Sequence, residues 1–175
     1  MIIHTSLENI PRLTSPVALT IGAFDGVHLG HQYLIQELKK QGTPVVLTFS
    51  NHPSEILRPE PVKPILTLPQ KLKLLDRFGV AMTIVLPFTK ELSQIPYDVF
   101  LKQIPFDTLV GGEDIRIGAR GGGTRETLSK LPYKTVFLPK FTVNGIAVSS
   151  RLIREHMNEA NKLLGYTWQD SLVES

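Results

Sequence analysis

The chain has 175 residues and a net charge of +3; 42% of its residues are hydrophobic and 20% charged, which is typical of one globular domain. It contains no cysteine, which excludes a disulfide scaffold, thiolate catalysis and a cysteine-bound zinc ion, and fits a reducing cytoplasm. No apolar run approaches the roughly 20 residues that cross a bilayer, and residues 1–12 lack a signal-peptide pattern. We therefore expect a single cytoplasmic domain over residues 1–175, without a membrane contact.

Apolar segments rich in β-branched residues predict strands, and amphipathic segments between and after them predict helices. The predicted strands are Val17–Ile21, Val45–Phe49, Met82–Leu86, Thr108–Val110 and Thr135–Leu138. The predicted helices are Gln32–Lys40, Pro69–Phe78, Tyr97–Ile104, Thr124–Leu131, Ser149–Met157 and Asn158–Gly165. Such alternation favours right-handed crossovers, and so an α/β fold with a parallel sheet of about five strands covered by helices on both faces. Asn144 and Gly145 predict a tight hairpin turn.

The stretch GAFDGVHLGH at residues 22–31 lies where the first predicted strand meets the first helix. The first turn of a helix attracts anions through its unpaired N–H groups and its dipole. His28 and His31, three residues apart, add donors on the same face, and Gly30 lets a phosphate approach the backbone. We interpret the stretch as a polyphosphate site. A metal site and a simple helix cap remain as alternatives.

Three other segments carry candidate chemistry. Residues 113–123 form a glycine-rich loop without the Gly-Lys-Ser/Thr ending of a phosphate-binding loop, so a linker and a ligand contact are both open. Ser149 and Ser150 fit a helix N-cap or a second phosphate cradle completed by Arg154. His52-Pro53 by itself is more typical of a surface turn. Hydride transfer and serine hydrolysis have no motif to support them.

Basic residues are scattered, except for Lys71 with Lys73 in one predicted helix and Arg116, Arg120 and Arg125 around the glycine-rich loop. A nucleic-acid partner would call for clustered bases interleaved with aromatic residues. The pattern favours small phosphorylated ligands, and we expect no nucleic-acid partner.

Together these motifs resemble a known family. The Gly22-x-Phe24-Asp25-x-x-His28-x-Gly30-His31 pattern is similar to the adenylyl/cytidylyl transferase signature, and the whole chain resembles the FMN adenylyltransferase module of prokaryotic bifunctional riboflavin kinase/FAD synthetases. The segments that carry the resemblance span nearly the full length: TIGAFDGVHLGH at 20–31, TFSNHP at 48–53, LPFTKEL at 86–92, VGGEDIRIG at 110–118, VSSRLIR at 148–154 and ANKLLG at 160–165.

The resemblance implies a Rossmann-like nucleotidylyl transferase fold and the reaction of FMN with ATP to FAD and pyrophosphate, with Mg²⁺ accompanying ATP. It implies catalytic roles for His28, His31 and Arg154 at the phosphates. It implies an ATP site that comprises Gly22, Phe24, Asp25, His28, Gly30, His31, Ser149, Ser150 and Arg154. It places His52, Pro53, Asp114 and Arg116 on the FMN side, and no residue is expected to bind a metal directly.

The sequence departs from the family pattern at a few positions. Ala23 stands where the family has Asn next to the nucleotide pocket, and Asn51 precedes His52-Pro53 where it has Pro. Arg151 and Leu152 replace a phosphate-binding Thr and an Arg. The resemblance would also place a riboflavin kinase domain after Gly165, which this sequence does not contain. A stand-alone enzyme supplied with FMN by a separate kinase and a cut chain both remain open. Transfer to another phosphate acceptor and a non-catalytic flavin or nucleotide binder are the alternative functions.

Overall fold

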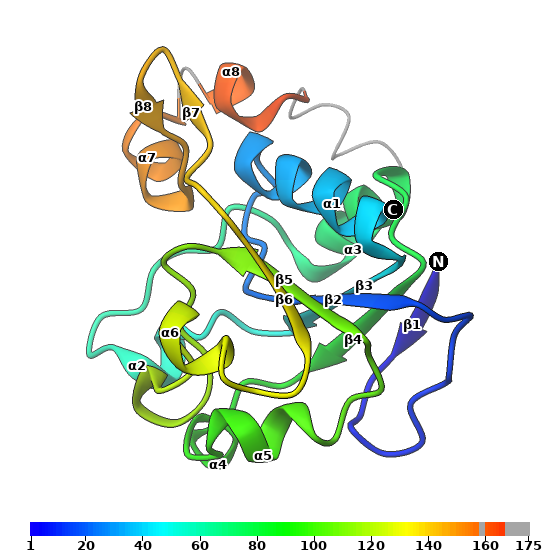
Figure 1. Cartoon of the computed structure of the whole chain (residues 1–175). Helices are drawn as coiled ribbons and strands as arrows, with labels where there is room; N and C mark the ends of the chain where they lie inside the picture. The colour runs from blue at the N-terminus through cyan, green and yellow to red at the C-terminus, as the bar shows by residue number, and fades with distance from the viewer. Residues whose placement is uncertain (158–159, 167–175) are drawn as a thin grey trace.

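The computed structural model describes residues 1–157 and 160–166, in which a six-stranded parallel sheet is flanked by helices (Figure 1). The strand order is β1-β4-β3-β2-β5-β6. The strands are β1 (Ile2–His4), β2 (Val17–Ile21), β3 (Thr43–Phe49), β4 (Met82–Leu86), β5 (Thr108–Gly112) and β6 (Lys134–Leu138). All five predicted strands are confirmed, three of them with an end extended by one or two residues. The edge strand β1 was not predicted, because its three residues are too short for a periodic signal.

Helices cover both faces of the sheet, as predicted. On one face α1 (Leu29–Gln41) and α3 (Leu68–Arg77) pack together, and on the other lie α4 (Lys90–Ser93), α5 (Tyr97–Leu101) and α6 (Arg125–Leu128) (Figure 1). Side chains that alternate along β2 enter two separate cores, with Ala18 in the first and Leu19 in the second. The remaining helical segments are α2 (Ser54–Leu57), η1 (Ala119–Gly121), α7 (Ser150–Glu155) and α8 (Ala160–Leu164).

The strands β7 (Thr142–Val143) and β8 (Ile146–Ala147) form the predicted hairpin. Asn144 and Gly145 at its tip have φ values of 52° and 79°, as a type I′ turn requires. The hairpin leads directly into α7, whose N-cap is Ser149. The last predicted helix, Asn158–Gly165, is α8 in its described part, and residues 158 and 159 lie outside the described residues.

The order of the strands places a topological switch beside β2. The chain proceeds from β2 to β3 and β4 on one side, and β5 and β6 lie on the other. In open parallel sheets, ligands bind beyond the carboxyl ends of the strands at such a switch. We therefore expect a ligand site at the ends of β2 and β5, where Gly22 and residues 111–116 lie.

The helical period decides which side chains of α5 and α3 are buried. In α5, Val99 is 48% exposed, whereas Phe100 and Leu101 are buried. In α3, Lys71 is 9% exposed although it is a basic residue. Lys71 lies one turn before Leu74 and Leu75, which are buried, so the helical period carries it onto the inner face.

Candidate functional site

His28 ends the β2–α1 segment and is the N-cap of α1. Its Nδ1 atom accepts a hydrogen bond from the backbone N–H of His31 at 3.4 Å, so the proton of the neutral ring lies on Nε2. Burial lowers the pKa of His28 from 6.5 to about 4, which keeps the ring neutral at physiological pH. The capping interpretation and the polyphosphate interpretation are therefore compatible, because one ring nitrogen caps the helix and the other is left to donate.

His31 stacks on His28, with the ring centroids 3.7 Å apart, and contacts the Phe24 ring at 4.8 Å. Among the described residues its buried Nδ1 has no hydrogen-bond partner. An unpaired acceptor is favoured there over an unpaired N–H, which also puts the His31 proton on Nε2. Burial, followed by the effects of His28 and Lys71, lowers the pKa of His31 well below its ordinary value. The two rings are thus neutral donors.

Gly30 keeps the space that the His28 ring occupies. A Cβ at this position would lie 3.1 Å from His28 Cε1, closer than most van der Waals contacts. A side chain here would require the His28 ring to shift by a few tenths of an ångström. The glycine of the motif therefore serves ring placement as well as the approach of a ligand to the backbone.

The two histidines open onto a cavity of about 420 Å³, which we call the histidine cavity. It lies beyond the ends of β2, β5 and β6 and is bounded on the far side by the β7–β8 hairpin. Of the residues predicted to bind a ligand, the structure gathers here Gly22, Phe24, His28, Gly30, His31, Asp114, Arg116 and Ser149. Asp114 was expected on the FMN side but lies in this wall.

A second cavity, of about 380 Å³, lies on the other side of the β2 end and is mostly apolar. We call it the apolar cavity. Phe49 and Phe88 meet edge to face in its wall with their centroids 5.0 Å apart, and Pro53 and Leu57 also line it. Of the four residues expected on the FMN side, Pro53 and Arg116 reach this cavity, whereas His52 does not.

The histidine cavity and the apolar cavity share part of their walls. Ile21, Gly22 and Arg116 line both. The shared residues are the end of β2 and one arginine from the segment after β5. The two cavities therefore adjoin at the end of β2, next to Gly22 and Arg116.

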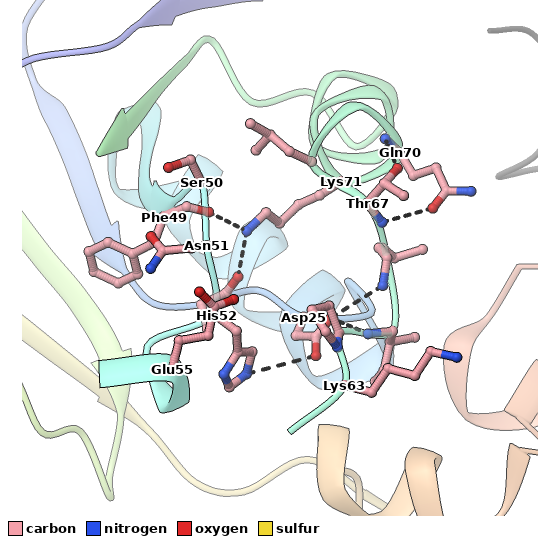
Figure 2. A pocket seen from close by; sticks show the side chains of 15 residues that line it. Asp25, Phe49, Ser50, Asn51, His52, Glu55, Lys63, Thr67, Gln70 and Lys71 are labelled. Atoms are coloured by element: carbon pink, nitrogen blue, oxygen red, sulfur yellow. Dashed lines mark hydrogen bonds and ion pairs between the residues drawn. The ribbon is translucent and has the colours of Figure 1, made fainter. Parts of the chain in front are cut away.

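Asp25 and Arg154 lie apart from the histidine cavity. Asp25 is 5% exposed, and its Oδ1 accepts hydrogen bonds from the backbone N–H groups of Ile65 and Leu66 at 2.8 and 3.3 Å. Its Oδ2 pairs with the Arg154 guanidinium and lies 3.8 Å from His52 Nε2. These contacts join Asp25 to three other segments that are distant in sequence. Figure 2 shows Asp25 beside His52. Asp25 and His52 both line a third cavity of about 520 Å³, which we call the lateral cavity.

The substituted family positions do not line the histidine cavity. Ala23 was expected next to the nucleotide pocket but lines the apolar and lateral cavities. Arg151 is exposed and bonds to Glu155 at 2.9 Å, and Leu152 donates its backbone N–H to Ser149 Oγ. Ser150 donates to the backbone oxygen of Asp25 at 2.7 Å, which ties α7 to the β2–α1 segment.

Sequence reasoning missed Lys71 as a site residue. Its Nζ donates to the backbone oxygens of Ala23 and Phe49 at 3.0 and 2.9 Å and to Thr48 Oγ1 at 3.1 Å. The available signal was its spacing from Leu74 and Leu75, which predicts a buried position for a residue that is rarely buried.

The described residues contain neither a cluster of metal ligands nor a membrane-spanning helix. Residues 1–157 and 160–166 contain no group of three or more His, Cys, Asp or Glu side chains arranged to hold a metal ion. Within the same ranges, no helix combines the length and apolarity needed to cross a membrane.

Curated relatives of this chain share one name. The bifunctional riboflavin kinase/FMN adenylyltransferase of Listeria monocytogenes is 32% identical over 169 residues, covering 86% of this chain and 54% of that protein. The Escherichia coli K12 protein of the same name is 30% identical over 161 residues, covering 83% and 51%. The chain thus spans about half the length of the curated relatives it matches.

Solved structures agree on the fold. A crystal structure from Streptococcus pneumoniae, described as a macrolide-efflux protein, has a TM-score of 0.85 and 26% identity, covering 95% of this chain and 62% of that one. Pantoate-beta-alanine ligase from Francisella tularensis has a TM-score of 0.59 at 17% identity, over 100% of this chain and 82% of that one. The ligase shows a shared α/β fold and nothing more. The FAD synthetase family model matches residues 10–152, and the chain belongs to that family.

Proposed function

We propose that this chain transfers AMP from ATP to FMN, forming FAD and pyrophosphate. The observation that carries the proposal is the junction between the two cavities. A cavity lined by a helix N-terminus and two imidazoles adjoins, at Gly22, a mostly apolar cavity lined by two phenylalanine rings. One cavity suits a nucleoside triphosphate, the other suits a flavin ring, and the reacting phosphates would meet where the walls are shared.

ATP would lie in the histidine cavity. The Nε2–H groups of His28 and His31 and the first N–H groups of α1 would donate to phosphate oxygens, as anion sites at helix N-termini do. Ser149, at the start of α7, lies in the same wall and would contribute from the opposite side. Mg²⁺ would arrive with ATP as part of the substrate, because the described residues contain no dedicated metal site.

FMN would place its isoalloxazine ring in the apolar cavity and its phosphate at the junction. Phe49 and Phe88 offer stacking and edge contacts to an aromatic ring. Arg116, which lines both cavities, would hold the FMN phosphate by its charge. We do not assign a phosphate contact to Arg154, because its guanidinium pairs with Asp25 in this arrangement.

The chemistry needs no nucleophile from the protein. An oxygen of the FMN phosphate attacks the α-phosphorus of ATP, a new P–O–P bond forms, the bond to the β-phosphate oxygen breaks, and pyrophosphate leaves. The attacking group is already an anion, so catalysis rests on alignment and on donors that meet the charge developing on the equatorial oxygens. His28, His31 and Arg116 would supply these donors.

The relatives support this assignment by their names, which combine riboflavin kinase with FMN adenylyltransferase. Riboflavin kinase activity produces the FMN that an adenylyltransferase consumes. The protein that carries this chain would therefore draw its FMN from such an activity, either in the same polypeptide or in a separate partner. We place it in the cytoplasm, where both activities have ATP.

The test is an acceptor panel. Pure protein is incubated with ATP and Mg²⁺ together with FMN, phosphopantetheine or a polyol phosphate, and products are separated by chromatography. We expect FAD from FMN and no adenylylated product from the others. An adenylylated product from another acceptor alone would replace the proposal with a different nucleotidylyl transfer. Quenching of flavin fluorescence without any product would identify a non-catalytic binder.

A further inference from the structure

Lys71 places an ammonium group inside the protein between the ends of two central strands. The side chain reaches from α3 toward Phe49, as Figure 2 shows, and 9% of the residue is exposed. Its three hydrogen-bond partners are oxygens of Ala23, Thr48 and Phe49. An ammonium group has three hydrogens, so donors and acceptors match in number.

These contacts join the β2–α1 segment to the end of β3. Thr48 Oγ1 also donates to the Ala23 oxygen at 3.0 Å, which closes the network. Ala23 and Phe49 line both the lateral cavity and the apolar cavity, so they form part of the wall between them. Ala23 follows Gly22, at which the apolar cavity meets the histidine cavity.

We propose that Lys71 is a positioning residue for the acceptor, holding Ala23 and Phe49 so that the apolar cavity keeps the shape that binds FMN. This inference rests on the proposed function. Lys71 does not line the apolar cavity and would not touch the flavin. It acts through the backbone of the two residues whose positions it fixes.

The energetics favour a role in the site over a role in stability. Burial lowers the pKa of Lys71 to about 8, an effect that the nearby Asp25 opposes. Because folding lowers this pKa, burial of the charged ammonium group reduces the free energy of unfolding at neutral pH. A gain in stability therefore does not explain why a lysine lies here. Above about pH 8 the neutral amine keeps only two hydrogens for three oxygens.

Other titratable groups surround Lys71, and their titration must be distinguished from that of Lys71. Asp25 of the β2–α1 segment and His31 of α1 interact electrostatically with Lys71. The lateral cavity adds His52, Glu55 and Lys63. Burial lowers the pKa of both His31 and His52 below the ordinary value of 6.5, away from pH 8. A change near pH 8 that Lys71→Met abolishes therefore belongs to Lys71, since Lys63 remains in the variant.

The experiment compares Lys71→Met with Lys73→Met, a matched change at an exposed position of the same helix. For Lys71→Met we expect the KM for FMN to rise about tenfold, with the KM for ATP changed less than about twofold. In the wild type the KM for FMN should rise as the pH passes about 8, and this rise should be absent in Lys71→Met. Lys73→Met should behave as the wild type does.

An effect of Lys71→Met that is equal for ATP and FMN would overturn the proposal. Equal losses toward ATP and FMN, or an unchanged KM for FMN, would show that Lys71 does not position the acceptor. If Lys71→Met does not fold, Thr48→Val decides, because it removes one partner of Nζ while keeping the side-chain shape. We then expect a rise of about threefold in the KM for FMN alone, and no rise would contradict the proposal.

FMN binding and FAD formation together distinguish a failure of the proposed function from a failure of the positioning role. If the wild type forms no FAD yet quenches FMN fluorescence, the adenylyl transfer fails, and weaker FMN binding by Lys71→Met still supports the positioning role. Equal FMN binding by the two proteins would overturn that role. A wild type that neither binds FMN nor forms FAD would overturn both.

Discussion

At the scale of single residues, the proposed function gives His28 two roles, which one side chain can perform because its two nitrogens differ. Nδ1 caps α1, and we propose that Nε2–H donates to a phosphate. Asn is a good N-cap but lacks the imidazole donor, so His28→Asn separates the two duties where His28→Ala removes both.

We expect both variants to lose about a hundredfold or more in kcat, the usual effect of removing a donor to a developing anion. His28→Ala should also lose up to about 1 kcal/mol of unfolding free energy, and His28→Asn should lose less. Steady-state kinetics and urea denaturation measure the two effects. An active His28→Asn would show that capping is the only duty of the residue.

The lowered pKa of His28 makes a second prediction, about stability in acid. The unfolded chain binds a proton at this residue below pH 6.5, whereas the folded chain does so only near pH 4. Between these values the unfolded state binds more protons, so stability falls as the pH falls. From pH 7 to 5 the wild type should lose about 1–2 kcal/mol more than His28→Asn in urea titrations. Parallel losses in the two proteins would contradict the buried, neutral ring.

Arg151 gives a third prediction at this scale. By resemblance, Arg151 stands where the family has a phosphate-binding Thr. Its side chain is 86% exposed and bonds to Glu155, outside the histidine cavity. We therefore expect Arg151→Thr to change kcat/KM less than about twofold, since such surface pairs contribute little. A large gain in kcat/KM would show that Arg151 obstructs the site.

At the scale of elements, the β7–β8 hairpin carries one wall of the histidine cavity, because Ala147 ends its second strand and Val148 and Ser149 follow directly. Gly145 has φ of 79°, and a Cβ there would meet nothing within 4 Å, so Gly145→Ala tests backbone strain alone. We expect a loss of about 1 kcal/mol in stability and a rise of up to about fivefold in the KM for ATP.

Gly145→Asn is the matched control, because Asn tolerates the left-handed region better than Ala does. It should keep most of the stability and the affinity for ATP. If Gly145→Ala loses stability with no change in the KM for ATP, the hairpin does not shape the nucleotide wall.

At the scale of the whole molecule, the alternation of strands and helices was enough to predict the sheet and the helices on both faces. The short edge strand β1 was not predicted, because three residues are too few to show a strand periodicity. The histidine motif was found because it is local, lying within one strand–helix junction. The contacts of Asp25 with Arg154 and of Lys71 with Phe49 join residues 129 and 22 positions apart, and no local pattern contains them. The sequence placed Asp25 and Arg154 at the phosphates by resemblance, and only tertiary structure shows that they pair beside another cavity.

The junction at Gly22 is the central claim, and the fate of the phosphates of ATP tests it most directly. Wild-type protein is incubated with FMN and ATP labelled either on the α- or on the γ-phosphate, and the flavin and pyrophosphate fractions are counted. We predict that the α-label enters the flavin and the γ-label enters pyrophosphate, with both transfers lost in His28→Asn. A γ-label in the flavin, or no label there while both substrates bind, would contradict the account.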